Sequence, residues 1–306
     1  MGKEYDVVII GGGPAGLTAG LYAARARNSS LLIERGLIGG MITEAEKVDN
    51  YPGFPEGISG YDLSELMHQQ ATRYGLETTF AEATGLEIKE GQKVIKTDNG
   101  NFVARTVIIA GGSQRQKLGA PGEKEFTGKG VSYCATCDAP FFSGKAVAVV
   151  GGGNTAIYEA LHLVKFAARV TVIHRRSQLR ATAVAQEKAF AEPKIKFLWN
   201  TVAEAIEGQD FVQRLRLRQV VTGKKSILEV AGIFIAIGLK PNTVYLRDTL
   251  PLDKLGHIIT DERMQTKIPG VFAAGDIRHN SIQQAIASAG DGATAAFYAK
   301  KFIDGE

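Results

Sequence analysis

The chain alternates between short, fully apolar runs and longer segments whose apolar positions recur at helical spacing. Residues 7–10 (VVII) form an apolar run that predicts a strand buried on both faces, as in a parallel sheet. A glycine-rich turn follows, then a segment of small and apolar residues that is typical of a helix, then a second apolar run at 31–33 that ends at Glu34. Residues 5–36 therefore predict a strand–helix–strand unit.

The same pattern occurs again at residues 146–177. His174 lies as far beyond Gly151 as Glu34 lies beyond Gly11, so we interpret the pattern as a duplicated architecture rather than a short-period repeat. Three further segments predict buried strands that run into glycines, and one predicts a helix rich in small residues. The strands fall within 105–113, 231–242 and 269–277, and the helix within 281–303.

Chain length and proline positions predict the domain organisation. A chain of 306 residues suggests about two domains. Pro121 and Pro241 lie near the edges of the second strand–helix–strand unit, where linkers are expected. The sequence predicts an α/β fold of two Rossmann-like dinucleotide-binding domains, the second inserted into the first. The expected boundaries are 1–116 with 244–306 for the first domain and 117–243 for the second.

Composition narrows the class of protein. The chain is 44% hydrophobic and 22% charged, and its formal net charge of +4 is too small to indicate a nucleic-acid partner. The N-terminus lacks the pattern of a signal peptide, and no apolar run reaches the ~18–20 residues of a membrane span. Two cysteines are too few for a secreted disulfide framework, so we expect a reducing, cytoplasmic compartment and no membrane partner.

Two glycine patterns match the dinucleotide-binding fingerprint: Gly11-x-Gly13-x-x-Gly16 and Gly151-x-Gly153-x-x-Ala156. The first glycine allows the tight turn, the second lets a pyrophosphate approach the backbone, and the third position must be small so that helix and strand pack closely. The phosphates then lie at a helix N-terminus, where free N–H groups favour an anion. A glycine-rich turn that binds nothing is the alternative, and the repeated context argues against it.

The residues that end the second strands distinguish the two ligands. Glu34 is suited to accept a hydrogen bond from a ribose 2′-hydroxyl and would repel a 2′-phosphate, which fits FAD or NAD. The second unit instead has His174-Arg175-Arg176, followed by Arg180. Arginine side chains match phosphate in geometry and charge, which indicates NADP, although a solvated basic loop remains the alternative.

Two dinucleotide sites on one chain imply electron transfer between two cofactors. One is expected to be a flavin, because a nicotinamide hydride needs a two-electron acceptor that passes electrons on. The segment VFAAGD supports this weakly, since a strand that ends beside a glycine and an acidic residue can place Asp276 next to the ribityl chain.

Cys134 and Cys137 are the only cysteines in the chain. A zinc site lacks the remaining ligands, because there is no second cysteine pair and the five histidines are scattered. A structural disulfide over so short a loop would remove little chain entropy. Redox exchange is the interpretation that remains, since Cys-x-x-Cys thiols exchange with other disulfides. Asp138, which follows the pair, is a candidate proton donor or acceptor, with a helix N-cap as the alternative.

The chain resembles the low-molecular-weight thioredoxin reductases of bacteria and archaea. The motifs GGGPAG, CATCD, GGGNTA, HRR with Arg180, IGLKPN and AAGD occur in the family's order and spacing over almost the whole chain. The resemblance implies that residues 1–116 and 244–306 bind FAD, that 117–243 binds NADPH, and that electrons pass through the Cys134–Cys137 disulfide to thioredoxin or a thioredoxin-like protein. It also implies a homodimer and a hinged movement of the inserted domain.

The resemblance assigns roles to individual residues. Cys137 would face the flavin, Cys134 would attack the thioredoxin disulfide, and Asp138 would donate the proton. Cofactor contacts are expected at the following positions: for FAD, Gly11, Gly13, Pro14, Ala15, Gly16, Glu34, Arg35, Gly39, Gly40, Met41, Asn50, Gly275, Asp276, Gln283, Gln284 and Ala285; for NADPH, Gly151, Gly153, Asn154, Thr155, His174, Arg175, Arg176 and Arg180.

The sequence departs from the family pattern at four places. Met41 replaces the usual Gln, Ala110-Gly111-Gly112 the usual Ala-Thr-Gly, Gln283-Gln284 the usual Arg-Gln, and Tyr158-Glu159 the usual paired glutamates. Two other functions compete with the first. One is a related flavin disulfide reductase that serves a peroxiredoxin or glutaredoxin-like protein or is fed by ferredoxin. The other is a non-catalytic redox sensor, which a complete electron path disfavours.

Overall fold

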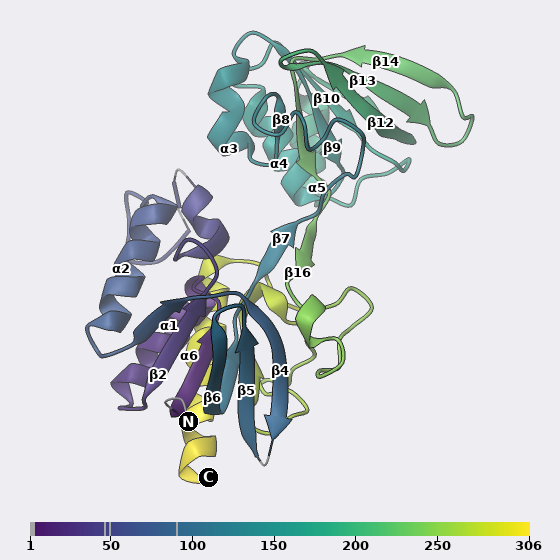
Figure 1. Ribbon diagram of the computed structural model, residues 1–306. Coiled ribbons are helices and arrows are strands. Elements are labelled where there is room, and N and C mark those ends of the chain that lie inside the picture. The colour runs from purple at the N-terminus through teal and green to yellow at the C-terminus, as the bar shows by residue number, and fades with distance from the viewer. Residues whose placement is uncertain (1–3, 46, 49, 90) are drawn as a thin grey trace. The chain divides into compact units, whose positions relative to one another are not determined.

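The chain forms two compact units joined by two crossing segments. The structure is a computed structural model that describes residues 4–45, 47–48, 50–89 and 91–306. Unit 1 comprises Met1–Gln114 with Lys240–Glu306, and unit 2 comprises Arg115–Leu239. The chain crosses between them through β7 (Ser113–Arg115) and β16 (Leu239–Pro241), which pair as a two-stranded sheet (Figure 1). Parallel strands joined by helices in both units confirm the predicted α/β fold class.

Unit 1 is built on one mixed sheet in the order β3-β2-β1-β6-β5-β4, with β17 also paired to β6. The long strand β6 pairs in antiparallel fashion with β5 through its first half and in parallel fashion with β17 through its second half. Its strands are β1 (Glu4–Ile10), β2 (Ser30–Glu34), β3 (Glu77–Phe80), β4 (Ala83–Lys89), β5 (Gln92–Thr97), β6 (Gly100–Ile109) and β17 (Val271–Ala273). Its helices are α1 (Pro14–Arg25), α2 (Gly60–Thr72) and α6 (Ala285–Asp304), with short 3₁₀ turns η1 (Gly40–Glu44), η3 (Val244–Leu246) and η4 (Gly275–Ile277).

The central strand β1 is buried on both faces, as its apolar run predicts. Val7 and Ile9 pack into a core with α1 and α6, whereas Val8 and Ile10 pack into a second core on the opposite face. Successive side chains of a strand point to opposite faces, so an unbroken apolar run is what a sheet covered on both sides requires.

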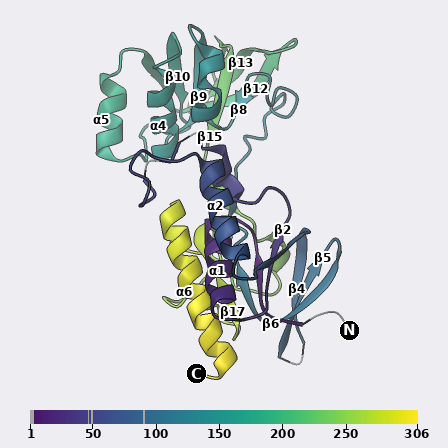
Figure 2. The same cartoon turned by 90° about the vertical axis from the view of Figure 1, so that its left-hand side faces the viewer.

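Helix α1 lies beside both α2 and α6 (Figure 2). A Cβ added to Gly292 of α6 would come within 2.0 Å of the carbonyl oxygen of Ala15 in α1. The two helices therefore touch backbone to backbone at this point, which explains why the C-terminal helix is rich in small residues.

Unit 2 repeats the layout with a parallel sheet in the order β11-β10-β9-β15-β8. Helices cover one face of this sheet, and a three-stranded antiparallel sheet, β12-β13-β14, shares a core with the other. The strands are β8 (Val131–Ser132), β9 (Ala146–Gly151), β10 (Arg169–Ile173), β11 (Ile195–Leu198), β12 (Thr201–Gly208), β13 (Val212–Gln219), β14 (Lys225–Glu229) and β15 (Gly232–Ala236). The helices are α3 (Ala135–Asp138), α4 (Asn154–Leu163) and α5 (Ala183–Ala191), with the 3₁₀ turn η2 (Ala139–Phe142).

Pro121 lies inside unit 2, where its carbonyl oxygen accepts a hydrogen bond of 2.9 Å from the N–H of Ile206. Pro241, in contrast, ends the crossing strand β16. Over the part of the chain that the structure describes, no helix combines the length and apolar character that a membrane span needs.

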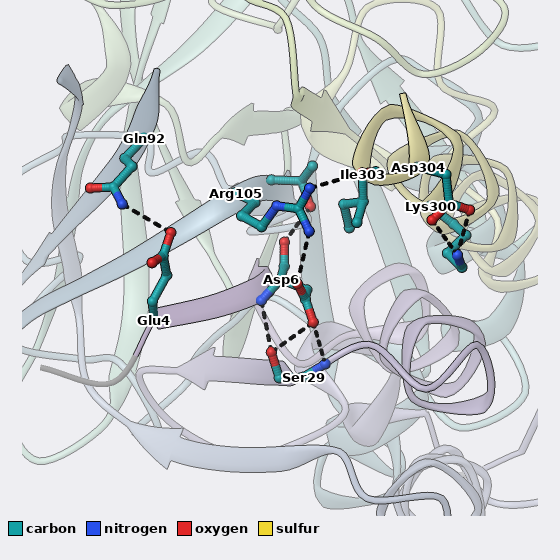
Figure 3. Close-up of polar contacts among 9 residues, drawn as sticks. Glu4, Asp6, Ser29, Gln92, Arg105, Lys300, Ile303 and Asp304 are labelled. Carbon is teal, nitrogen blue, oxygen red and sulfur yellow. Dashed lines mark hydrogen bonds and ion pairs between the residues drawn. The ribbon is translucent and has the colours of Figure 1, made fainter. Parts of the chain in front are cut away.

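Polar contacts tie the N-terminal strand of unit 1 to its neighbours (Figure 3). The Asp6 carboxylate accepts hydrogen bonds of 2.9 Å from both the N–H and the hydroxyl group of Ser29. Arg105 donates to Asp6 at 3.4 Å and to the carbonyl oxygen of Ile303 in α6 at 2.8 Å. Burial tends to raise the pKa of Asp6, but the Ser29 hydrogen bonds and Arg105 hold that pKa below its ordinary value of 3.8.

Asp6→Asn should destabilise unit 1 by roughly 1–2 kcal/mol at pH 7, because the charged acceptor is lost. Since the folded-state pKa is lowered, this stabilisation is present above pH 3.8 and is lost as the pH falls through the folded-state value. Chemical denaturation at pH 7 and at pH 3 measures the difference between variant and parent, which should shrink at the lower pH. Glu4→Gln, at an exposed position bonded to Gln92, is the control and should change stability by less than about 0.5 kcal/mol. Equal effects of the two substitutions would contradict the assignment.

Candidate functional site

The turn between β1 and α1 brings backbone groups so close together that two of its glycines leave no room for a Cβ atom. Gly11 has a φ of 105°, and a Cβ there would lie 2.4 Å from the carbonyl oxygen of Ala110. A Cβ on Gly16 would lie 1.8 Å from the carbonyl oxygen of Gly11. At Gly13, by contrast, the nearest atom to an added Cβ is the carbonyl oxygen of Gly39, at 3.7 Å. The middle glycine thus leaves space beside the backbone at the start of α1, as a pyrophosphate requires.

Glu34 closes this turn from the end of β2. Its two carboxylate oxygens accept hydrogen bonds from the N–H of Gly12 at 2.6 Å and from the N–H of Gly36 at 2.9 Å. The side chain is therefore fixed next to the glycine turn and half-buried, in the position expected for a ribose hydroxyl acceptor. Arg35, the next residue, points to Glu82, with 3.6 Å between the charged groups.

Asp276 lies in η4, directly after β17. Its carboxylate accepts hydrogen bonds from the hydroxyl groups of Ser281 at 3.2 Å and Ser288 at 3.3 Å. Burial raises the pKa of Asp276, although these hydrogen bonds oppose the shift. Sequence reasoning missed the two serines because serine is common in loops and nothing in its spacing indicates a partner.

Asn50 and Gln284 are far apart in sequence but meet in space, since the Asn50 amide donates to the Gln284 side-chain oxygen at 2.9 Å. The adjacent Gln283 has a φ of 57°, in the left-handed region. The other predicted flavin contacts lie on the same elements: Pro14 and Ala15 open α1, Gly39 precedes η1, Gly40 and Met41 begin it, Gly275 begins η4, and Ala285 begins α6.

The second glycine turn, between β9 and α4, repeats this geometry in unit 2. A Cβ on Gly151 would lie 2.2 Å from the carbonyl oxygen of Ala236, and one on Gly152 would lie 2.3 Å from the ring of His174. A Cβ on Gly153, however, would have no atom within 4 Å. The space beside the start of α4 therefore fits a second pyrophosphate.

His174 and the arginines that follow it have different surroundings. The His174 ring is buried against Gly152 and donates from Nε2 to the carbonyl oxygen of Gln178 at 3.0 Å. Burial lowers its pKa, and the nearby charges of Arg180 and Arg176 lower that pKa further. The structure thus gives His174 a packing role inside the turn and leaves the arginine side chains exposed.

Arg175, Arg176 and Arg180 have no carboxylate within ion-pair distance among the residues that the structure describes. The backbone N–H of Arg180 donates to the Gly152 carbonyl oxygen at 2.6 Å, which ties the arginine loop to the glycine turn. Asn154 and Thr155 form the first turn of α4, and the Asn154 side chain accepts from the N–H of Thr182 at 2.8 Å. Three unpaired positive charges next to an open helix N-terminus suit a phosphorylated ligand.

Cys134 and Cys137 form a disulfide at the start of α3, with 5.4 Å between their Cα atoms. Cys137 is exposed and Cys134 is half-buried. The Cys134 sulfur accepts a hydrogen bond from the N–H of Cys137 and contacts the hydroxyl group of Thr136, both at 3.2 Å. A sulfur in this position would have its thiolate form stabilised by the same donors after reduction.

Asp138 ends α3 and precedes η2 without a side-chain hydrogen bond that caps that turn. Within the described ranges, no group of three or more His, Cys, Asp or Glu side chains is arranged to hold a metal ion. The chemistry that the arrangement offers is thus a reactive disulfide in the same unit as an arginine-lined dinucleotide turn.

Comparisons with known proteins agree with this geometry. A family model described as pyridine nucleotide-disulphide oxidoreductase matches residues 5–292. A thioredoxin reductase of Bacillus subtilis is 44% identical over 303 residues, which cover 99% of this chain and 96% of that protein. The crystal structure of Lactococcus lactis thioredoxin reductase superposes with a TM-score of 0.88 at 42% identity, covering 99% of this chain and all of that one. The thioredoxin reductase of T. acidophilum gives a TM-score of 0.85 at 33% identity, with 99% of each chain covered.

Gly152→Ala and Gly153→Ala should separate folding from ligand binding. The first places a Cβ against the His174 ring and should destabilise unit 2 by roughly 1–3 kcal/mol. The second fills open space, so it should leave stability nearly unchanged and weaken binding of the dinucleotide. Thermal unfolding with and without NADPH measures both effects. If NADPH stabilises Gly153→Ala against thermal unfolding as much as it stabilises the parent protein, the pyrophosphate does not bind at this turn.

Proposed function

The chain belongs to the pyridine nucleotide-disulphide oxidoreductase family, as a low-molecular-weight thioredoxin reductase, and we propose a role for each part of its site. The glycine turn of unit 1 binds FAD, the glycine turn of unit 2 binds NADPH, and the disulfide reacts with thioredoxin. In this activity, electrons pass from NADPH through FAD to the Cys134–Cys137 disulfide and on to thioredoxin. The observation that carries the proposal is the disulfide at the start of α3, in the unit that also holds the arginine loop.

Unit 1 has the features that hold FAD. The open backbone at Gly13 would receive the pyrophosphate, Glu34 would accept a hydrogen bond from the adenosine ribose, and the buried carboxylate of Asp276 would contact the ribityl chain. When bound, the flavin supplies a two-electron link between the nicotinamide and the disulfide. The hydrogen bond between Asn50 and Gln284 fixes two further side chains predicted to contact it.

Unit 2 binds NADPH at its own glycine turn. Gly153 leaves the backbone open to the pyrophosphate, and the exposed side chains of Arg175, Arg176 and Arg180 would contact the 2′-phosphate. An NADH-specific enzyme would be expected to have a carboxylate at the end of the second strand, as Glu34 is in unit 1. We therefore assign FAD to the turn with the carboxylate and NADPH to the turn with the arginines.

The disulfide exchange uses residues of α3. After reduction, the Cys134 thiolate attacks one sulfur of the thioredoxin disulfide and forms a mixed disulfide, while the other thioredoxin sulfur leaves and takes up a proton from Asp138. The Cys137 thiol then attacks the Cys134 sulfur of the mixed disulfide and breaks its bond to thioredoxin. The Cys134–Cys137 disulfide forms again, the proton of the Cys137 thiol passes to the departing thioredoxin sulfur, and thioredoxin leaves as a dithiol. Cys137 is the sulfur that would face the flavin in the preceding step.

A homodimer and a cytoplasmic location complete the proposal. Large apolar side chains are exposed on three helices of unit 1, with Tyr22 on α1 at 47%, Leu66 on α2 at 49% and Phe297 on α6 at 55%. A hollow of about 270 Å³ lies on the same helices, lined partly by Leu17 and Met67. An exposed apolar surface of this kind supports burial against a second copy. The absence of further cysteines fits a compartment that keeps thiols reduced.

Arg175→Ala should raise the KM for NADPH about 10- to 100-fold, because one charge-assisted contact with the 2′-phosphate is lost. The KM for NADH should change little, since NADH has no phosphate there. Stopped-flow reduction of the bound flavin by each nucleotide measures both values. Lys224→Ala, an exposed cation elsewhere in unit 2, is the control. Equal losses with NADPH and NADH would refute phosphate recognition.

Cys134→Ser and Cys137→Ser should abolish NADPH-dependent reduction of thioredoxin to the level of the blank reaction. NADPH should still bleach the flavin absorbance in both variants, because the nucleotide and flavin sites are intact. A panel of thioredoxin, glutaredoxin-like and peroxiredoxin substrates, assayed with the parent protein, tests the alternative partners. Thioredoxin turnover by either serine variant would disprove the disulfide route.

A further inference from the structure

Thr136 lies between the two cysteines and has a hydroxyl group that the proposed reaction does not use. Its Oγ1 lies 3.2 Å from the sulfur of Cys134. A disulfide sulfur carries no hydrogen, so in the oxidised protein the hydroxyl group is the donor and the Cys134 sulfur is the acceptor. The same sulfur accepts a second hydrogen bond, also of 3.2 Å, from the backbone N–H of Cys137. Two donors therefore converge on the sulfur that would attack thioredoxin.

The backbone at Cys134 is held independently of these two donors. Its N–H donates to the Ser132 hydroxyl oxygen at 3.1 Å, and that hydroxyl group donates to the Cys134 carbonyl oxygen at 3.2 Å. Ser132 is itself buried. The guanidinium group of Arg115 donates to the carbonyl oxygen of Tyr133, the residue before Cys134. The sulfur is thus attached to a fixed backbone, and the first turn of α3 sets where the Thr136 hydroxyl group lies relative to it.

Packing does not account for a threonine at this position. The side chain of Thr136 is exposed, whereas Ala135, the other residue between the cysteines, is buried and has no polar side-chain group. Threonine is also less favourable than alanine inside a helix. The hydroxyl group is therefore the feature of Thr136 that acts on the site.

The hydrogen bond to the Cys134 sulfur becomes stronger when that sulfur is charged. Reduction of the disulfide gives a thiol, and loss of its proton gives a thiolate. A hydrogen bond to an ionised acceptor is roughly twice as strong as one between neutral groups, so the Thr136 hydroxyl group stabilises the thiolate more than the thiol. Hydrogen bonding to the charged form of a group favours that form, which for a thiol means a lower pKa.

We propose that Thr136 is a catalytic residue of the disulfide exchange, whose hydroxyl group donates to the Cys134 sulfur and keeps more of it in the thiolate form that attacks thioredoxin. During the attack, the thiolate forms a bond with one thioredoxin sulfur and the electron pair moves to the other, while Thr136 keeps its own proton. Below its pKa, a thiol gains more in thiolate fraction than it loses in nucleophilicity, so the exchange becomes faster near neutral pH.

The inference rests on the proposed function, but its test follows the ionisation of Cys134 without thioredoxin. In a Cys137→Ser background Cys134 is the only thiol, and residue 137 keeps its backbone N–H. The FAD-loaded protein is treated anaerobically with dithiothreitol and then freed of it. The rate of iodoacetamide alkylation is measured by mass spectrometry from pH 5 to pH 10. Adding Thr136→Val should raise the midpoint of the profile by about half a pH unit, because a methyl group replaces the donor. Thr136→Ser, which keeps the hydroxyl group, should retain the parent midpoint.

Thr222→Val, at an exposed threonine in the turn between β13 and β14, is the matched control and should leave the midpoint unchanged. The other titratable groups near the cysteines are the same in every variant, so a shift confined to Thr136→Val comes from the hydroxyl group. These groups are Asp138 on α3, Tyr158, Glu159 and His162 on α4, and Arg115, Glu123 and Tyr133 around the preceding loop.

Equal midpoints for the parent and Thr136→Val would overturn the inference, and so would a shift of the same size in Thr136→Ser or Thr222→Val. If Thr136→Val does not fold, Thr136→Ala removes the same hydroxyl group and gives the same readout. Thioredoxin turnover is measured separately, in the chain that has both cysteines. Turnover together with an unshifted midpoint contradicts the inference alone. The predicted shift without any turnover contradicts the proposed function alone.

Discussion

Both cofactor sites depend on backbone atoms approaching one another where no Cβ can fit. At the end of β1 and again at the end of β9, the chain leaves a buried strand and turns at once into a helix, so the helix N-terminus lies directly over the strand end. The small residue five positions after the first glycine of each motif, Gly16 in one and Ala156 in the other, keeps that helix close. The free N–H groups at the start of α1 and α4 then face open space beside Gly13 and Gly153. The side chains that distinguish the two ligands, the carboxylate at one turn and the arginines at the other, can act only because this close packing positions the ligand.

The local elements were predictable because each depends on residues close together in sequence. The strand–helix–strand units at 5–36 and 146–177 appear where the apolar periodicity placed them, and the C-terminal helix begins at Ala285, within its predicted segment. The three-stranded sheet β12-β13-β14 was not predicted. Its strands contain many exposed charges, as in the alternation along β13, so they lack the unbroken apolar run that indicates a buried parallel strand.

Some site residues could likewise be predicted from the sequence, and others could not. Glu34 could be assigned from the sequence, because its distance from Gly11 is fixed by one strand–helix–strand unit. The sequence also singled out His174 as a ligand contact, which stays a prediction. The structure adds that its ring packs against Gly152 and bonds the carbonyl oxygen of Gln178, neither of which the sequence indicated. The partners of Asp276 depend on tertiary packing between helices and loops. No periodicity or spacing in a single sequence encodes such contacts.

The order in which the two units can fold during translation follows from the pairing of β6 with β17 and from the contact between α1 and α6. The N-terminal part of unit 1 is synthesised first, but its mixed sheet gains β17 and its α1 surface is covered by α6 only after all of unit 2 has been made. Unit 2 is continuous and can therefore complete its core while unit 1 still exposes the apolar side of α1. During translation, the inserted unit should reach its native state before the unit that surrounds it, and the waiting nascent segment is the part that a chaperone would need to protect.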